Sequence, residues 1–282
     1  MAPSLTFLFI RWWRTSSIAS SEVQIDDNCP CQVNYPNRNR THSARGNCGD
    51  RKNSEAKMSG GAAGTANNLL KILCIHGYRQ NAKAFREKTG SLRKALKKQA
   101  EFVYIDAPNA ISSTDNDENV DQLGWWFSKP NQCFNAREDS TFCEGYEESV
   151  QVVVDAVKEH GPFDGILGFS QGASMVSFIC SLQCKGDSRF SFDFAILVAG
   201  FKSLNSMHDS LYDQPITIPT LHVFGDTDNV IPKEMSEQLL KYFVEPQTLG
   251  HSGGHFVPAS SPQKKVYVEF LSPYVERKLK NS

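Results

Sequence analysis

Short apolar runs alternate with amphipathic segments from about residue 69 to the end of the chain. The runs carry apolar residues at successive positions rather than at every second one, so they predict strands that are buried on both faces. The predicted strands lie at residues 69–75, 102–105, 166–169, 194–198 and 220–224, with a short strand at about 244–249.

The segments between these runs have apolar residues at helical spacing. The predicted helices lie at residues 85–96, at 146–160 before the stop signal Gly161-Pro162, after Gln171, at 232–243, and from about residue 262 to residue 280. Alternating strands and helices predict an α/β protein whose parallel sheet is covered on both faces. Right-handed crossovers then bring the strand ends, and with them a site, to one edge of the sheet.

Residues 1–66 have a different composition. The stretch at 26–68 is rich in Asn, Ser, Gly and Arg and shows no apolar periodicity, and we predict a disordered N-terminal extension at 1–66 followed by a folded domain at 67–282. The first 21 residues contain Arg11 and Arg14 but no acidic side chain, so mitochondrial import is one alternative for this segment. Met58 begins a stretch that runs straight into the domain, and we expect residues 1–57 to be dispensable.

The extension also contains a loose group of metal-binding residue types, namely Cys29, Cys31, His42 and Cys48. Their spacing fits no common zinc pattern, so no metal site is predicted.

Net charge and cysteine usage narrow the class of protein. The formal net charge is −1, which gives no basic field for nucleic acid. No apolar run approaches the roughly 20 residues of a membrane helix, so no stable membrane insertion is predicted. The pattern of the five cysteines in the predicted domain is typical of reduced thiols in an intracellular protein. We therefore expect the protein in the cytoplasm, with the nucleus as a further location. Oligomeric state is not determined by the sequence.

A long polar stretch at 109–143 interrupts the strand–helix alternation. A connection of this length in a compact domain is usually a lid or a binding loop. Its one apolar cluster is Trp125, Trp126 and Phe127. These side chains are candidates for the wall of an apolar substrate pocket, and the alternative is that they anchor the loop in the core.

The segment around Ser170 has the pattern of a nucleophile elbow. Gly168-x-Ser170-x-Gly172 follows a predicted strand and precedes a predicted helix, which is the context that this motif requires. The turn is so tight that a strained backbone is expected at the serine and glycine is needed on either side. Ser170 is therefore the candidate nucleophile.

A serine hydroxyl needs a base within hydrogen-bond reach, and the base needs an orienting carboxylate. In the elbow fold both come from loops after later strands, in the order serine, acid, histidine. The candidate acids are Asp228 and Asp226, and Asp228 is preferred because Asp226 suits a turn or cap. The candidate bases are His255 and His251, and His255 is preferred because two glycines precede it.

The oxyanion of an acyl-transfer reaction needs two N–H donors. One is expected from Gln171, directly after the nucleophile, and the other from Tyr78 in the loop after the first strand. His76 precedes that loop and is predicted to pack and shape it without transferring protons.

Several motifs occur together in a fixed order. They are His76-Gly77-Tyr78-Arg79-Gln80-Asn81, Asp106-Ala107-Pro108, Trp125-Trp126, Gly168-Phe169-Ser170-Gln171-Gly172, Asp228-x-Val230-Ile231-Pro232 and Gly253-Gly254-His255-Phe256-Val257-Pro258. In combination they resemble the FSH family of serine hydrolases, and within it the ovarian-cancer-associated gene 2 esterase group, over about residues 69–275. The resemblance implies an α/β-hydrolase fold of about six mostly parallel strands without a large cap domain.

Carried over residue by residue, the resemblance implies a catalytic triad of Ser170, Asp228 and His255 and needs no cofactor. It implies a serine carboxylesterase that acts on a small-molecule ester, with a leaning toward medium- to long-chain alkyl or acyl esters. Two alternatives stay open: a thioesterase with the same triad, acting on acyl-proteins or acyl-CoA, and a ligand-binding module that uses the fold without turnover.

Overall fold

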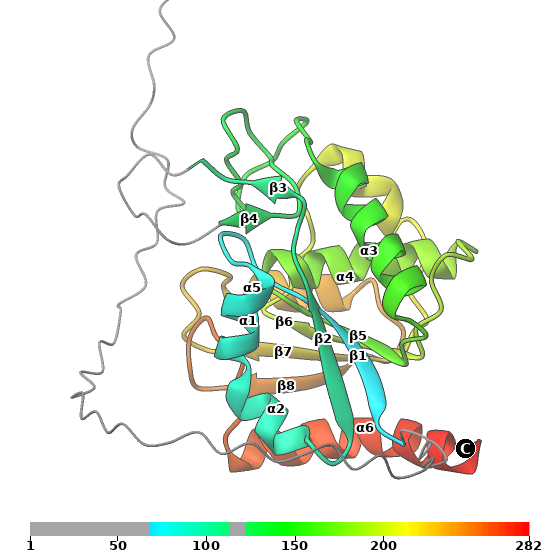
Figure 1. Ribbon diagram of the computed structural model, residues 1–282. Helices are drawn as coiled ribbons and strands as arrows, with labels where there is room; N and C mark the ends of the chain where they lie inside the picture. The colour runs from blue at the N-terminus through cyan, green and yellow to red at the C-terminus, as the bar shows by residue number, and fades with distance from the viewer. Residues whose placement is uncertain (1–67, 113–121, 282) are drawn as a thin grey trace, which may run out of the picture.

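The computed structural model describes residues 68–112 and 122–281. Its centre is a six-stranded sheet in the order β2-β1-β5-β6-β7-β8, in which every neighbouring pair is parallel (Figure 1). The strands are β1 (Leu70–Ile75), β2 (Ala100–Ile105), β5 (Gly165–Phe169), β6 (Phe194–Val198), β7 (Thr220–Gly225) and β8 (Gln247–His251). The predicted α/β class and its parallel sheet are confirmed.

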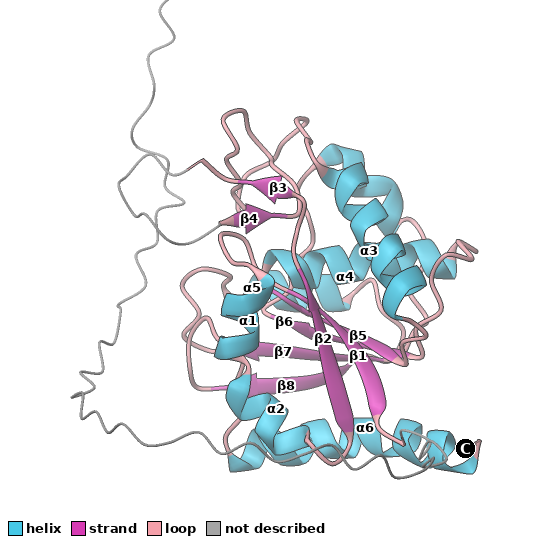
Figure 2. Cartoon of the chain, viewed as in Figure 1, coloured by secondary structure: helices cyan, strands magenta, loops and turns pink. Residues whose placement is uncertain are grey.

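Helices cover both faces of the sheet (Figure 2). They are α1 (Ala82–Lys88), α2 (Gly90–Leu96), α3 (Tyr146–His160), α4 (Gln171–Cys184), α5 (Lys233–Leu240) and α6 (Ser261–Lys280). On one face α6 contacts β1, β8 and α2. On the other face α4 packs on β5 and β6, with α3 beside it, where the rings of Tyr146 and Phe178 lie 5.7 Å apart.

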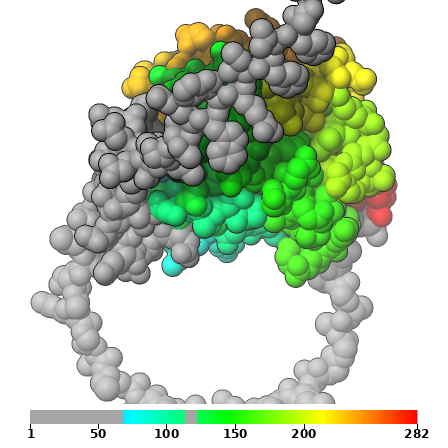
Figure 3. Space-filling view, turned by 90° about the horizontal axis from the view of Figure 1, so that it is seen from above, coloured from blue at the N-terminus to red at the C-terminus, as the bar shows by residue number. Residues whose placement is uncertain are grey.

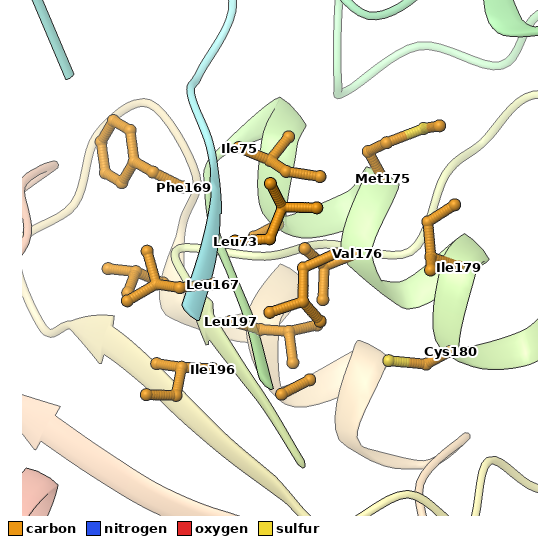
Figure 4. Close-up of a cluster of buried hydrophobic side chains, with 14 of the residues drawn as sticks. Leu73, Ile75, Leu167, Phe169, Met175, Val176, Ile179, Cys180, Ile196 and Leu197 are labelled. Carbon is orange, nitrogen blue, oxygen red and sulfur yellow. The ribbon is translucent and has the colours of Figure 1, made fainter. Parts of the chain in front are cut away.

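Alternate side chains of the strands fill the two layers of the core. Leu73, Ile75 and Leu197 face Val176 of α4, whereas Leu167 points away from that helix (Figure 4). Helix α4 lies between the sheet and the outer segments, and its residues 171–181 are all buried. This explains why its sequence is apolar or small on every side.

Three predicted boundaries differ from the structure. The segment predicted as one helix at 85–96 is two helices, because the Thr89 hydroxyl bonds back to the Phe85 carbonyl oxygen at 2.8 Å and Gly90 begins α2. The strand predicted at 244–249 begins and ends later, as β8. Pro232 caps α5 instead of opening it, and that helix ends at Leu240.

The long stretch after β2 folds onto the sheet edge. It contains a small antiparallel pair, β3 (Asn109–Ala110) with β4 (Leu123–Gly124), and then packs against a 3₁₀ helix, η1 (Ser206–Tyr212), that the sequence did not predict. The rings of Trp126 and His208 lie 5.4 Å apart at this contact. In the space-filling view, green atoms of this stretch and of α3 lie beside yellow-green atoms of a later part of the chain (Figure 3).

Several predictions concern the N-terminal extension and lie outside the described residues. They are the disorder of residues 1–66, the import signal and the group Cys29, Cys31, His42 and Cys48. Within the described ranges Cys74, Cys143, Cys180 and Cys184 are free thiols, and no set of three His, Cys, Asp or Glu side chains gathers as metal ligands would. Across the same residues no helix has the length and apolar character needed to span a membrane.

Candidate active site

Ser170 lies at the sharp turn between β5 and α4. Its backbone has φ 55° and ψ −120°, the strained conformation that the motif predicts. A Cβ on Gly168 would lie 2.3 Å from the Gly172 carbonyl oxygen, and a Cβ on Gly172 would lie 2.3 Å from the His76 carbonyl oxygen. Only glycine fits at these two positions, and the turn presents the serine at the end of the central strand.

Asp228 and His255 form a buried hydrogen-bonded pair. Nδ1 of His255 lies 2.7 Å from Oδ2 of Asp228, and their side chains are 6% and 1% exposed. The other carboxylate oxygen accepts the N–H groups of Val230 and Ile231, both at 2.9 Å. Because the carboxylate is held by these backbone donors, it fixes the ring so that Nδ1 is the protonated nitrogen and Nε2 is left to act as a base.

Ser170 and His255 line the same cavity, of about 250 Å³. The Ser170 hydroxyl makes no hydrogen bond to the imidazole within the described residues. Hydrogen bonds between catalytic groups are often long in unliganded enzymes and tighten when substrate binds. The three residues predicted to act together are thus gathered at one edge of the sheet, with the acid–base contact made and the serine beside it.

The two alternative residues have other partners. Asp226 is half exposed and accepts a hydrogen bond from Nζ of Lys233 at 3.0 Å. His251 ends β8, its Nδ1 accepts the Gly253 N–H at 3.2 Å, and its ring lies 5.0 Å from that of Phe256. Burial lowers the pKa of His251. The geometry therefore favours Asp228 over Asp226 and His255 over His251.

Two backbone N–H groups are placed as the sequence predicts for an oxyanion hole. Gln171 is the first residue of α4, and Tyr78 lies in the loop after β1 and lines the cavity. Neither N–H donates a hydrogen bond to another described residue, so both are available to a ligand. The N-terminal end of α4 adds the positive end of its helix dipole.

The side chain of Gln171 makes contacts that the sequence did not predict. Its Oε1 accepts the Trp125 N–H at 2.9 Å, and its Nε2 donates to the Trp126 carbonyl oxygen at 2.7 Å. The side chain thereby ties the residue after the nucleophile to the stretch that follows β4. No local pattern indicated this pairing, because it joins residues 45 or 46 positions apart.

His76 shapes the loop that carries Tyr78. Its Nδ1 bonds the Gly77 carbonyl oxygen at 2.8 Å, and its Nε2 accepts the Ala107 N–H at 3.0 Å. Burial lowers the pKa of His76 to about 4, so the ring is neutral at neutral pH. The indole N–H of Trp125 donates to the His76 carbonyl oxygen at 2.7 Å. These contacts match the packing role expected for this histidine.

Trp125, Trp126 and Phe127 are at most 3% exposed, and none of them lines the cavity beside Ser170. Of the two readings of this cluster, the geometry fits loop anchoring in the core. The apolar wall of the cavity comes instead from Tyr78, Phe134, Phe169, Val230 and Ile231. Phe134 belongs to the same long stretch, and its isolation among polar neighbours was the only sequence signal for it.

A second cavity, of about 280 Å³, adjoins the first. The two share Gln80, Phe169 and His255. Ser170 and Tyr78 line only the first cavity, whereas Phe85, Phe256 and Val257 line only the second. His255 therefore lies where the two cavities meet.

Comparison with known proteins shows which family this chain matches. The family model described as serine hydrolase (FSH1) matches residues 66–267. The chain is 50% identical over 216 residues to "Esterase OVCA2" of Xenopus tropicalis, which covers 73% of this chain and 94% of that protein. It is 42% identical over 225 residues to "Esterase OVCA2" of Homo sapiens, covering 75% and 99%.

Solved structures support the fold. The crystal structure of esterase PE8 aligns with a TM-score of 0.52 at 19% identity, covering 72% of this chain and 92% of that one. That of Zea mays acyl-protein thioesterase 2 aligns with a TM-score of 0.51 at 17% identity, covering 74% and 97%. At these identities the likeness bears on the fold alone, and it confirms the predicted α/β-hydrolase fold.

Proposed function

Because this chain belongs to the serine hydrolase (FSH1) family and is a serine hydrolase, we propose that it is a carboxylesterase that acts through an acyl-enzyme on Ser170. The observation that carries the proposal is the 2.7 Å bond between Asp228 and His255 at the cavity that also holds Ser170. The relatives named esterases agree with this reading.

The proposed reaction begins when the Ser170 hydroxyl attacks the ester carbonyl carbon. His255 takes the hydroxyl proton at Nε2, and the charge on its ring is stabilised by Asp228. The N–H groups of Gln171 and Tyr78 hold the oxyanion that forms. When the tetrahedral intermediate collapses, the bond to the alcohol oxygen breaks and His255 gives that oxygen its proton.

Deacylation repeats these steps with water. A water molecule loses a proton to His255 and adds to the acyl carbon, and the bond to Ser170 then breaks as the serine regains a proton. The products are a carboxylic acid and an alcohol. The burial of the Asp228–His255 pair favours this chemistry. A positive charge that forms on the ring is stabilised by a fixed carboxylate, and little water lies between them to weaken the attraction.

Labelling with a fluorophosphonate probe tests the proposed nucleophile. The wild-type protein is expected to label and the Ser170→Ala variant is not. A matched control is Ser177→Ala, since the hydroxyl of that buried serine in the same helix bonds, among the described residues, the Ser174 carbonyl oxygen and the Tyr212 hydroxyl. Failure of the intact protein to label would favour a ligand-binding module.

The thioesterase alternative uses the same residues and needs a separate measurement. Rates on oxygen esters and thioesters with the same acyl chain, taken from a series of rising chain length, distinguish the two activities. A clear preference for the oxygen ester supports the carboxylesterase, and a clear preference for the thioester contradicts it.

A further inference from the structure

His255 lies at the junction of the two cavities. The carbonyl carbon must reach Ser170 and the carbonyl oxygen must reach the N–H of Tyr78, and both of these residues line the first cavity only. The leaving oxygen must reach His255, which lines both. Given the proposed function, the acyl part belongs in the first cavity and the alcohol part in the second.

The first cavity is positively charged. Arg79 and Arg137 line it, and no Asp or Glu is among the described residues that do. Within the part of the chain that the structure describes, neither arginine forms an ion pair with a carboxylate. An acyl group that enters this cavity therefore meets two guanidinium groups and no acidic side chain.

The two arginines differ in how many of their N–H donors already have an acceptor in the protein. Arg137 donates to the Val230 carbonyl oxygen at 3.2 Å from Nε and 3.0 Å from Nη2, and Nη2 also contacts the Asn229 carbonyl oxygen. Nε of Arg79 is buried and has no hydrogen-bond partner among the described residues. Because that nitrogen has almost no accessible surface, a ligand in the cavity can bind Arg79 only through the terminal nitrogens of its guanidinium.

The backbone fixes Arg79 next to the proposed oxyanion donor Tyr78. The residue has a left-handed conformation, with φ 60°, and its N–H donates to the Leu123 carbonyl oxygen at 2.9 Å. It directly follows Tyr78, whose N–H is a proposed oxyanion donor, and its guanidinium lies 5.8 Å from the centre of the Tyr78 ring. A group that binds Arg79 is thus close to the reacting carbonyl.

The chemistry of a guanidinium selects a carboxylate, which it can bind through two parallel hydrogen bonds. The two cavities, of about 250 and 280 Å³, each lie below the usual range of pockets for drug-sized ligands, which favours a short acyl part and an alcohol of limited length. The second cavity has an aromatic and aliphatic lining from Phe85, Phe169, Phe256 and Val257, and its polar side chains are Gln80, Lys88 and His255. It suits the hydrocarbon of an alcohol.

We propose that the substrate is a hemiester of a short dicarboxylic acid and an apolar alcohol, with the free carboxylate bound by Arg79. This proposal rests on the proposed esterase function and adds the charge of the acyl group to it. Hydrolysis consumes one water and yields a dicarboxylate and the alcohol.

A pair of isosteric substrates tests the proposal. Monohexyl glutarate carries the free carboxylate, and the hexyl ester of glutaramic acid carries a neutral amide of the same shape. The ratio of their kcat/KM values is expected to favour the carboxylate by about tenfold or more in the wild-type protein. In Arg79→Gln the ratio should fall to near one, and in Arg79→Lys it should take an intermediate value.

Two further variants control for other sources of charge. Arg277→Gln removes a positive charge from α6, where Arg277 pairs with Asp193, and should leave the ratio unchanged. Lys88→Met tests the second cavity. Loss of the preference in Lys88→Met but not in Arg79→Gln overturns the proposal, as does a wild-type ratio near one. Fluorophosphonate labelling of the same samples separates this failure from a failure of the esterase function, because Ser170 then still labels.

Discussion

The side-chain oxygen of Gln171 accepts a hydrogen bond from the Trp125 N–H at 2.9 Å. The same side chain donates to the Trp126 carbonyl oxygen. Gln171 therefore serves the proposed active site twice, because its N–H is a proposed oxyanion donor while its side chain fixes the neighbouring segment. Both functions meet at the residue directly after the nucleophile.

Replacing Gln171 by Ala should lower kcat by about tenfold or more, because the oxyanion donors lose the contact that orients them. It should also lower the free energy of unfolding by about 1–3 kcal/mol, since two buried backbone groups lose their partner. Steady-state kinetics and urea unfolding measure the two effects.

Gln183→Ala is a matched control for that variant. The Gln183 side chain makes a similar pair of bonds, to the N–H and the carbonyl oxygen of Phe192, on the far end of the same helix. It should lose stability without losing kcat. If Gln171→Ala also keeps its kcat, the side chain stabilises the fold and has no positioning role.

The Asp228→Asn variant should lose kcat by a factor of about 10³ to 10⁴. The Asn oxygen can still accept the N–H groups of Val230 and Ile231, so the amide nitrogen turns toward His255. The ring must then accept at Nδ1 and carry its proton on Nε2, where it cannot act as a base. Kinetics on a p-nitrophenyl ester measure the loss. Asp226→Asn, which removes only an exposed pair with Lys233, should change kcat less than twofold.

Gly172→Ala should destabilise the protein by about 2–4 kcal/mol and remove most of its activity. The new Cβ would lie 2.3 Å from the His76 carbonyl oxygen and 2.4 Å from that of Ile75, and these backbone atoms can move only by displacing the end of β1. Gly250→Ala is the comparison, because a Cβ there has no atom within 4 Å. Thermal unfolding of both variants measures the difference in stability, and equal melting temperatures would contradict the expected clash.

The free energy of unfolding should fall as the pH drops from about 6.5 toward 4. Burial lowers the pKa of His76 and of His208 to about 4 and that of His222 to about 3. Below their ordinary pKa of about 6.5 these side chains bind protons when the chain is unfolded but not when it is folded. Each should therefore weaken the fold by about 1 kcal/mol at pH 5.5 relative to pH 7.5. Urea titrations at these two pH values measure the change. An equal free energy of unfolding at both would contradict the expectation that these histidines are buried in their neutral form.

Deleting residues 1–57 should leave activity and melting temperature nearly unchanged. The family match begins at residue 66, and the similarity to the Xenopus tropicalis relative covers 94% of that protein. The comparison is between the full chain and one that begins at Met58. A large fall in melting temperature in the shorter chain would mean that the extension packs on the domain.

Local chemistry explains why Ser170 could be placed from the sequence. An elbow requires glycines at fixed offsets between a strand and a helix, and all of these lie within one short stretch. The order of acid and base after later strands gave Asp228 and His255 in the same way, since parallel strands end at one edge. The break at Thr89 was missed because a single side chain-to-backbone bond, backed by the Tyr104 hydroxyl at 2.6 Å, decides it.

The cavity walls could not be predicted, because they depend on residues that are distant in the sequence. An apolar triplet such as Trp125, Trp126 and Phe127 fits a pocket or a core equally well by composition. The fold buried it, since the Gln171 side chain and the His76 carbonyl oxygen bind its polar groups. Phe134 was brought to the cavity instead, 5.4 Å from the ring of Tyr78.

The strand–helix alternation, the parallel sheet and the three residues proposed to carry the reaction could all be predicted from the amino-acid sequence. These follow from periodicity and from backbone constraints that act over a few residues. The lining of the two cavities, their meeting at His255 and the position of Arg79 in one of them depend on the tertiary fold. These features arise where separate loops pack together at the sheet edge. The contacts between such loops join residues that are distant in the sequence, so no short stretch of sequence determines them.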